Sequence, residues 1–554
     1  MSEKESINTD VSRRSFLTAT GVAALAAAGC APLSEGMSNG TPVAPKRDAQ
    51  AIANAPKAPF DSFRDWIAAL DAHGLLYRIP EIDQDAYHAT ALFYRATDKF
   101  SMYGAPAFMF DRIKIDGEWV EGPMFANHQG HWITDCLIWG LDPIENDNYA
   151  SYRKARGYLE KMLADNNGEY PMIPPREIEA SAAPCKEIVL TGDDIDITKF
   201  AFFKTNPGDG GRYVNTGSVF MDDPKMGPNY GTYRNEIKGP RKLVMNPEPN
   251  QTGHRMIMAA RKRGDKVLKL SIVVGQDPVI WMISGSKIKN RFTTKDPIYE
   301  LDIAGGMRGK AIDIVKSETN DLMIPAHAEM VIEGEIVLDG PMEPEGPFGE
   351  MFGYMGPAKS ENFVINITTI THRKNPWLMN AFTGMQRGMV TAPADALYAT
   401  SLKKKIPNIV EYTNPHDTMG MVVLSIDKQE AGEGIKSGMS IAKTNPIAKV
   451  VVVVDKDINI LDHREVMFAI GSRWQPHPAS KILERAFGLQ TDPSQVKRNR
   501  TSKIVIDATR QLPDEGGREA FPMSNREHLA EGAPNAFAEV EQLLVPDLFE
   551  WDQI

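Results

Sequence analysis

Between residues 187 and 373 the chain consists of short runs of β-branched residues, and this pattern limits the fold more than any other feature. The runs include VLKLSIVVG, AEMVIEGEIVLDG and ENFVINITTITHR, and Gly, Pro or Asp residues separate them. β-Branched residues favour strands, and the separating residues favour turns. Strands this numerous, with turns this frequent, predict a β-barrel or β-sandwich in the middle of the chain.

Mixed helical and strand patterns flank this region on both sides. The segment DSFRDWIAALDAHG spaces its apolar residues for one helix face, with Asp61 or Ser62 as N-cap and Gly74 as C-terminal stop. Nearer the C-terminus, ADALYATSLKKKIPNIVEY, REVMFAIGSRW and SKILERAFG are predicted helices, whereas IAKVVVVVDKD and TSKIVIDAT are predicted strands. The run Val450–Val454 indicates burial on both faces, as in a parallel sheet covered by helices. We therefore predict a mixed α/β fold with an α/β unit on each side of the central strands.

Length and charge narrow the class of protein. A chain of 554 residues exceeds the size of a single hydrophobic core, so several domains are expected. Its 73 acidic residues outnumber its 62 basic residues, which gives a net charge of −11. This balance argues against a nucleic-acid partner bound through phosphate neutralisation.

The first thirty residues have the composition of a targeting signal. In SRRSFLTATGVAALAAAGC, the pair Arg13 and Arg14 precedes a run of small apolar residues that ends at Cys30. The run is shorter than the about 20 apolar residues that span a bilayer, and it fits a cleavable signal. The paired arginines resemble a twin-arginine signal, and AAGC resembles a lipoprotein box with Cys30 as the lipid-bearing residue. A disordered cytosolic tail is the alternative.

Two further cysteines, Cys136 and Cys185, lie far apart in the sequence. They could form one disulfide in an oxidising compartment, but small buried apolar side chains are the favoured interpretation. The sequence contains no Cys-x-x-Cys or His-x-x-x-His pattern that would suggest a structural zinc site.

The stretch EPEGPFGEMFGY places Glu345 and Glu350 on a loop of restricted shape. Pro347 fixes its own φ and restricts Gly346, while Gly349 can adopt φ values closed to other residues. Two carboxylates that face one cavity do not both ionise easily unless a cation lies between them. Taken alone, the motif is equally compatible with an exposed acidic turn.

Several motifs in a fixed order resemble those of the UbiD family of prenylated-flavin-dependent decarboxylases. They are GRYVNTGSVFMDDPKMGPNYGTYRNEI, GHR at 253–255, YELDIAGGMRG, AEMVIEGEI, PEGPFGEMFGY and THRKNPW. FRDWIAALDAHGLLYRIPEID resembles the family's N-terminal opening, and AKVVVVVDKDINILDHREVMFAIGSRWQP resembles part of its C-terminal domain. The resemblance extends over about residues 60 to 510 and implies that the central domain is a split β-barrel that binds flavin.

The resemblance implies a catalytic set made of Arg234, Glu345 and Glu350. Arg234 would hold the substrate carboxylate and pair with Glu345, which stays ionised through charge-assisted hydrogen bonds. Glu350 would then donate the proton that replaces carbon dioxide. The alternative for Arg234 is an arginine at a strand edge that forms a surface salt bridge.

The family's divalent-metal site corresponds to Asn229, His254 and Glu300. This mixed donor set suits Mn²⁺ or Mg²⁺ better than zinc, and the metal would bridge to the flavin phosphate. A potassium ion beside it is also implied. Arg255, next to His254, and Lys428 are further predicted cofactor-binding residues.

The predicted organisation follows from these patterns: signal 1–30, linker 31–59, N-terminal α/β domain 60–180, split β-barrel 181–376, and C-terminal α/β domain with its tail 377–554. The twin-arginine signal implies loading with cofactor in the cytoplasm and then folded export, to the periplasm or the outer side of the cytoplasmic membrane.

The function expected from the resemblance is reversible decarboxylation of an aromatic or α,β-unsaturated acid on prenylated FMN, which acts as electron sink. A flavin prenyltransferase would supply the cofactor, and the enzyme would be a dimer or hexamer. Two segments near the substrate, 382–396 and 473–490, depart from the common family pattern. The alternatives are an exported FMN-dependent oxidoreductase or electron carrier, and a lipid-anchored binding protein for aromatic acids.

Overall fold

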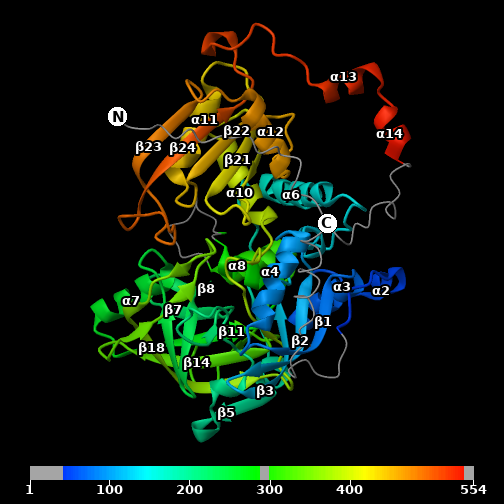
Figure 1. Cartoon of the computed structure of the whole chain (residues 1–554). Helices are drawn as coiled ribbons and strands as arrows, with labels where there is room; N and C mark the ends of the chain where they lie inside the picture. The colour runs from blue at the N-terminus through cyan, green and yellow to red at the C-terminus, as the bar shows by residue number, and fades with distance from the viewer. Residues whose placement is uncertain (1–41, 287, 289–298, 542–554) are drawn as a thin grey trace, which may run out of the picture.

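The structure is a computed structural model that describes residues 42–286, 288 and 299–541. It contains an N-terminal α/β part, a strand-rich middle and a C-terminal α/β part, coloured blue to cyan, green, and yellow to orange in Figure 1. The predicted mixed α/β class is therefore confirmed. The predicted signal, 1–30, and the first part of the predicted linker, 31–41, lie outside the described residues.

The N-terminal part is built on a four-stranded sheet with the order β1-β2-β3-β19. Its elements are α2 (Ala49–Asn54), α3 (Phe63–Ala72), β1 (Leu76–Asp83), α4 (His88–Phe100), β2 (Ala107–Ile115), β3 (Glu118–Ala126), α5 (Thr134–Leu137), α6 (Asn148–Asp165) and β19 (Leu378–Met379). β19 pairs with β3 in parallel, so this sheet takes a strand from beyond residue 376. α2 lies within the predicted linker, and it forms because the Asp48 carboxylate accepts a hydrogen bond from the Gln50 amide at 2.8 Å.

The predicted helix at 61–74 is confirmed as α3. Ser62 is its N-cap, and the side chains of Ser62 and Asp65 each accept a hydrogen bond from the other residue's backbone amide, both at 3.2 Å. Phe63 and Trp66 are fully buried beneath the helix. Gly74 follows with a φ of +70°, which ends the helix at low conformational cost.

The middle part is a ten-stranded sheet that curls into a half-barrel (Figure 1). Its main path has the order β6-β9-β10-β18-β14-β11-β7-β8, and β5 and β15 both pair with β18. The strands are β5 (Ile188–Thr191), β6 (Tyr213–Val214), β7 (Ser218–Asp223), β8 (Gly227–Thr232), β9 (Arg234–Gly239), β10 (Lys242–Asn246), β11 (Val267–Val274), β14 (Met330–Val337), β15 (Glu343–Glu345) and β18 (Lys359–His372). Neighbouring strands run antiparallel, and the curl of this single sheet confirms the predicted split barrel rather than a sandwich.

Smaller elements surround the half-barrel. They are β4 (Arg176–Glu177), β12 (Asp313–Lys316), β13 (Met323–Pro325), β16 (Phe348–Gly349), β17 (Met355–Gly356), α7 (Thr252–Arg263), α8 (Pro278–Gly285), α9 (Glu300–Arg308), and the 3₁₀ helices η1 (Ala180–Ala182), η2 (Pro184–Lys186), η3 (Gly192–Asp194) and η4 (Ile197–Lys199). The segment DIAGGMRGKAIDIV forms most of α9 and then β12.

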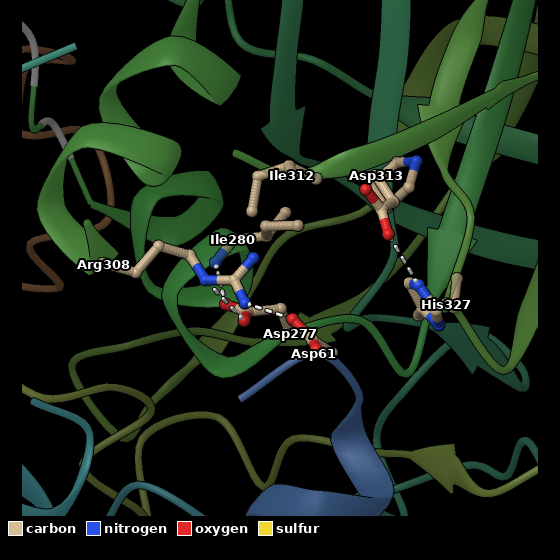
Figure 2. A pocket seen from close by; sticks show the side chains of 9 residues that line it. Asp61, Asp277, Ile280, Arg308, Ile312, Asp313 and His327 are labelled. Carbon is tan, nitrogen blue, oxygen red and sulfur yellow. Dashed lines mark hydrogen bonds and ion pairs between the residues drawn. The ribbon is translucent and has the colours of Figure 1, made fainter. Parts of the chain in front are cut away.

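A small polar cavity links the start of α3 to the barrel (Figure 2). The buried Arg308 guanidinium donates to Asp61 at 2.8 Å and lies 3.4 Å from Asp277. Asp277 also caps α8, because its carboxylate accepts a hydrogen bond from the Val279 amide at 2.7 Å. This cluster fixes the N-terminal part against the barrel.

The C-terminal part is a five-stranded sheet with the order β20-β21-β22-β24-β23. Its elements are α10 (Ala392–Lys403), β20 (Ile409–Thr413), β21 (Met421–Ile426), α11 (Glu433–Thr444), β22 (Val450–Asp455), α12 (His463–Arg473), β23 (Ser480–Phe487), β24 (Arg500–Ala508), η5 (Pro513–Glu515), α13 (Asn525–Gly532) and α14 (Ala536–Glu541). β22 is parallel to both neighbours, β21 and β24, and Val451–Val454 are fully buried. The prediction of parallel strands covered by helices is confirmed for β21, β22 and β24, whereas the edge strands β20 and β23 pair antiparallel.

Two helix predictions in this part were wrong. SKILERAFG forms β23, and NIVEY forms β20 rather than a continuation of α10. Leu, Glu, Lys, Arg and Ala favour helices in isolation. The antiparallel pairing of β23 with β24, in which Ser480 lies opposite Ile506, overrides this preference.

Helices α6 and α10 pack side by side and attach the C-terminal part to the N-terminal part (Figure 1). Three buried contacts on this side join the two parts. Tyr152 Oη of α6 donates to Asp395 Oδ2 of α10 at 2.6 Å, and Arg156 Nη1 of α6 donates to Glu411 Oε1 of β20 at 2.9 Å. Arg387, which precedes α10, pairs through Nη2 with Asp135 Oδ2 of α5 at 2.5 Å. Ion pairs this deeply buried are costly to open once formed. The C-terminal part is therefore held firmly on this side.

Cys136 and Cys185 are both free and buried, which confirms that they act as small core side chains. Of the helices in the described ranges, not one has the length and apolar character needed to cross a membrane.

Candidate active site

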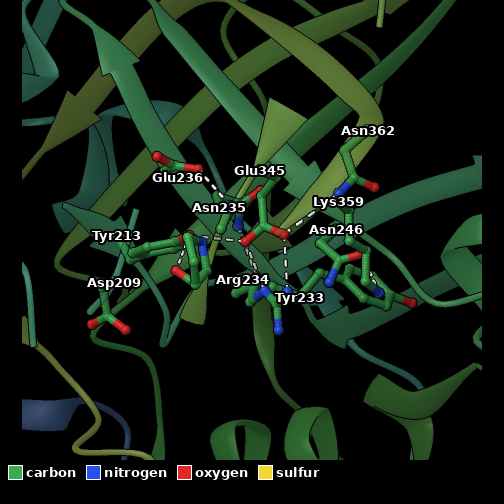
Figure 3. A network of polar contacts seen from close by, with 12 residues as sticks. Asp209, Tyr213, Tyr233, Arg234, Asn235, Glu236, Asn246, Glu345, Lys359 and Asn362 are labelled. Carbon is green, nitrogen blue, oxygen red and sulfur yellow. Dashed lines mark hydrogen bonds and ion pairs between the residues drawn. The ribbon is translucent and has the colours of Figure 1, made fainter. Parts of the chain in front are cut away.

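The half-barrel brings Arg234 and Glu345 into direct contact, although they are more than a hundred positions apart (Figure 3). Arg234 is the first residue of β9, and Glu345 is the last residue of β15. Arg234 Nε donates to Glu345 Oε1 at 2.8 Å, and Nη2 donates to Oε2 at 2.9 Å. This bidentate geometry gives the strongest form of an arginine–carboxylate pair and fixes the plane of both groups.

Glu345 receives further hydrogen bonds from the barrel wall. Tyr213 Oη donates to Glu345 Oε1 at 2.9 Å, and Asn362 Nδ2 donates to Oε2 at 3.4 Å. Burial and the Glu345 charge both raise the pKa of Tyr213, so its hydroxyl stays a donor. Hydrogen-bond donors from three side chains thus surround the Glu345 carboxylate and hold it in place.

Glu350 is held differently from Glu345. Arg234 Nη1 donates to Glu350 Oε1, so the arginine contacts both glutamates. The Glu345 side chain is 0% exposed, whereas the Glu350 side chain is 18% exposed. Burial alone would lower the pKa of Arg234, but the two carboxylates raise it above its ordinary range. The site therefore has one enclosed carboxylate and one that solvent or substrate can reach.

The loop between the two glutamates is clamped by backbone hydrogen bonds. The Gly346 amide donates to Glu236 Oε2 and the Gly349 amide donates to Asp209 Oδ1, both at 2.9 Å. The Gly210 amide donates to the Pro347 carbonyl at 2.7 Å. Burial raises the pKa of Asp209. With Glu345 fully buried and the loop held at three points, the alternative of an exposed acidic turn is wrong.

A substitution at Gly210 tests how closely the segment around Gly210 must approach the loop between Glu345 and Glu350. A Cβ added there would lie 2.5 Å from the Gly346 carbonyl oxygen, which is backbone and cannot move alone. We expect Gly210→Ala to destabilise the protein by about 1–3 kcal/mol, as overpacking does, and to lower activity. Chemical denaturation would measure the stability. Gly157→Ala is the control, because a Cβ at Gly157 has open space and should be neutral or stabilising. Equal stability of the two variants would contradict the close approach of Gly210 to the Gly346 carbonyl.

The structure brings together two of the three predicted metal ligands. Asn229 in β8 and Glu300 at the start of α9 are both buried, and Asn229 Nδ2 donates to Glu300 Oε1 at 2.6 Å. Asn229 Oδ1 is buried and accepts no hydrogen bond within the described part of the chain. His254, in α7, instead lies against Phe363, with ring centroids 5.9 Å apart, and burial lowers its pKa. Over the described ranges, there is no group of three His, Cys, Asp or Glu side chains that could hold a metal ion.

Family models match two adjoining stretches of the chain. The 3-octaprenyl-4-hydroxybenzoate carboxy-lyase Rift-related domain matches residues 176–386, and the C-terminal domain of the same carboxy-lyase matches residues 388–508. Together these matches span more than half of the chain. An uncharacterized protein of Archaeoglobus fulgidus is 30% identical over 484 residues, which cover 84% of this chain and 94% of the relative.

The chain belongs to the UbiD family. A phenolic acid decarboxylase of Escherichia coli O157:H7 is 28% identical over 480 residues, covering 84% of this chain and 95% of that protein. This protein is therefore an enzyme of the carboxy-lyase class.

Solved structures of UbiD-class enzymes share the fold. Vanillic acid decarboxylase of Sedimentibacter hydroxybenzoicus in its open form is 25% identical, with a TM-score of 0.72 over 88% of this chain and 100% of that chain. An evolved dimeric form of HmfF from Pelotomaculum thermopropionicum, in complex with prFMN, is 26% identical, with a TM-score of 0.67 over 85% of this chain and 100% of that chain.

The remaining predicted cofactor residues of this UbiD-family chain lie apart from Arg234. Arg255 is exposed on α7. Lys428 follows β21 in the C-terminal sheet, where its buried ammonium donates to Thr509 Oγ1 at 2.9 Å and pairs with Glu515. Both roles stay predictions.

Sequence reasoning missed four residues that build this site: Tyr213, Asn362, Asp209 and Glu236. Tyr213, Glu236 and Asn362 lie in strands, and no neighbouring residue indicates their contacts with Glu345 or with the loop that follows it. Asp209 precedes Gly210 and Gly211, and such a pair of glycines is a sign of close backbone approach that could have drawn attention to it.

Proposed function

We propose that this enzyme reversibly and non-oxidatively decarboxylates an aromatic or α,β-unsaturated carboxylic acid on prenylated FMN. The observation that carries the proposal is one arginine held between two unequal glutamates, Glu345 enclosed and Glu350 accessible. Similarity to a phenolic acid decarboxylase, to vanillic acid decarboxylase and to a prFMN complex of HmfF supports it.

The geometry suggests how the three residues divide the work. Glu345 occupies Nε and Nη2 of Arg234, which leaves Nη1, now on Glu350, as the position where a substrate carboxylate can bind. Once the substrate takes this position, Glu350 is released from Arg234 and faces the bound acid. Glu350 then donates a proton to the carbon from which carbon dioxide has left.

Asn229 and Glu300 fit a divalent cation that anchors the cofactor. No donor from the described residues reaches the Asn229 amide oxygen, and the adjacent carboxylate adds a second hard oxygen ligand, as Mn²⁺ and Mg²⁺ prefer. We propose His254 as the third ligand, Arg255 and Lys428 as contacts of the flavin phosphate, and a potassium ion beside the divalent metal. When bound, the prenylated flavin supplies the electron sink for the reaction.

We further propose that the N-terminal segment directs export by the twin-arginine route after cofactor loading, with Cys30 as the lipid-bearing residue. A flavin prenyltransferase would supply the cofactor in the cytoplasm, and the enzyme would assemble as a dimer or hexamer. The substrate, a small aromatic or unsaturated acid, would be met in the periplasm or on the outer side of the membrane.

Coexpression with a flavin prenyltransferase tests this function. We expect mass spectrometry of the purified enzyme to detect prenylated FMN, and a panel of aryl and acrylic acids to include one that releases carbon dioxide. Asn229→Ala should lose bound flavin, because it removes a predicted anchor of the cofactor. Unmodified FMN together with a redox activity would contradict the proposal and favour the alternative, an exported FMN-dependent oxidoreductase or electron carrier.

A further inference from the structure

The loop between β23 and β24, residues 488–499, reaches from the C-terminal sheet to the barrel beside the candidate site. Arg498 Nη2 lies 3.5 Å from Glu248 Oε2, and Arg498 Nε donates to Gln490 Oε1 at 2.8 Å. Burial alone would raise the pKa of Glu248, but hydrogen bonds from Lys359 and Gln490 lower it below its ordinary value. Two side chains of this loop thus converge on one carboxylate of the barrel.

Glu248 is itself connected to the strands that carry Arg234 and Glu345. Its carboxylate pairs with Lys359 and accepts a hydrogen bond from Asn246 Nδ2 at 3.4 Å. Asn246 lies opposite Arg234 in the β9–β10 pair, and Lys359 lies opposite Glu345 in the β15–β18 pair. Figure 3 shows Asn246 and Lys359 on the same side of the network.

Glu248 also supports the start of α7. Its backbone amide donates to Gln251 Oε1 at 2.7 Å, and Gln251 is the N-cap residue of that helix. His254, a predicted metal ligand, follows in the first turn. A change in the position of Glu248 would therefore alter the positions of both Arg234 and His254.

The C-terminal part also comes close to the barrel at a second place, beside Glu350. A Cβ built on Gly420 would be 3.3 Å from Cε1 of Phe352, two residues after Glu350. The C-terminal part is thus held by buried contacts at α6 and α10, and it approaches the site through Gly420 and through the β23–β24 loop.

We infer that the β23–β24 loop closes the C-terminal part over the site through Glu248, and that Glu248 is a positioning residue. Arg498 is 63% exposed, and a partly exposed ion pair is weak enough to open and re-form during turnover. The effect of this contact on catalysis rests on the proposed function. The contact between the C-terminal part and the barrel does not depend on that function.

Paired distance measurements test the closing contact without substrate. Spin labels at Lys225→Cys in the β7–β8 turn and Lys436→Cys on α11, with Cys30 replaced by Ser, report the separation of the two parts. We expect Arg498→Ala to broaden the distance distribution toward longer values. The control, Arg464→Ala, removes an exposed pair with Asp462 in the same part of the chain and should leave the distribution unchanged. Equal distributions in the two variants would overturn the inference.

Kinetics on an accepted acid test the positioning role. Arg498→Ala should lower kcat/KM by about twofold to fivefold, the size expected for a partly exposed pair, mainly through a higher KM. Arg498→Lys should recover part of the loss. In a Glu248→Gln background, Arg498→Ala should have no further effect, because the partner charge is already gone. If Arg498→Ala lowered kcat/KM as much in the Glu248→Gln background as in the wild type, Glu248 would be excluded as the partner. A wild type without decarboxylase activity would contradict the proposed function alone, because the distance measurement needs no turnover.

Discussion

Replacing Glu350 with Gln should lower the rate of carbon dioxide release by about 10²- to 10⁴-fold while the flavin content stays at the wild-type level. The amide oxygen can still accept the hydrogen bond that Arg234 Nη1 donates to Glu350, so the arginine stays in place. The amide cannot supply an acidic proton. Steady-state kinetics and the flavin absorbance per protein would separate loss of chemistry from loss of cofactor.

Glu343→Gln is the matched control for this variant. Glu343 is the first residue of β15, two residues before Glu345, and pairs with Lys242 at the surface. Its replacement should change the rate by no more than about twofold, because exposed pairs contribute little. If Glu350→Gln turned over as fast as Glu343→Gln, the proton would have to come from another group.

Arg234→Ala should lose both stability and activity. It would leave the fully buried Glu345 carboxylate without its bidentate partner, and breaking a buried ion pair in this way costs about 3–5 kcal/mol. It would also remove the proposed binding group for the substrate carboxylate. Denaturant unfolding and carbon dioxide release would measure the two losses separately.

A double variant distinguishes the two roles of Arg234. Arg234→Ala combined with Glu345→Gln removes the uncompensated charge, so it should recover much of the stability and none of the activity. If the single variant Arg234→Ala were as stable as the wild type, Arg234 and Glu345 would not form the buried ion pair that their contacts indicate.

Local sequence patterns were sufficient to predict the helices and strands whose conformation depends mainly on their own residues. The capped helix α3 and the buried strand β22 are examples, because Ser62 and the valine run act on their immediate surroundings. β23 shows the limit of such reasoning. Its residues favour a helix, and only pairing with β24 makes it a strand.

The contact between Arg234 and Glu345 could be predicted because family motifs mark both residues. The contacts of Tyr213 and Glu236 with the loop at 345–350 could not be predicted, because each reaches that loop from a strand more than a hundred positions away. The side-chain direction of His254 was likewise inaccessible. Its place after Gly253 is consistent with the family pattern, whereas the packing of α7 against β18 turns the ring toward Phe363.

Deuterium incorporation during decarboxylation in D₂O tests most directly whether Glu350 protonates the product within the Arg234–Glu345 site. Mass spectrometry should find one deuterium in the wild-type product, at the carbon that carried the carboxylate. With Glu350→Gln, exchange of deuterium into that carbon on incubation with product should slow by about the same 10²- to 10⁴-fold as carbon dioxide release. Full deuterium incorporation by Glu350→Gln at the wild-type rate would contradict the account.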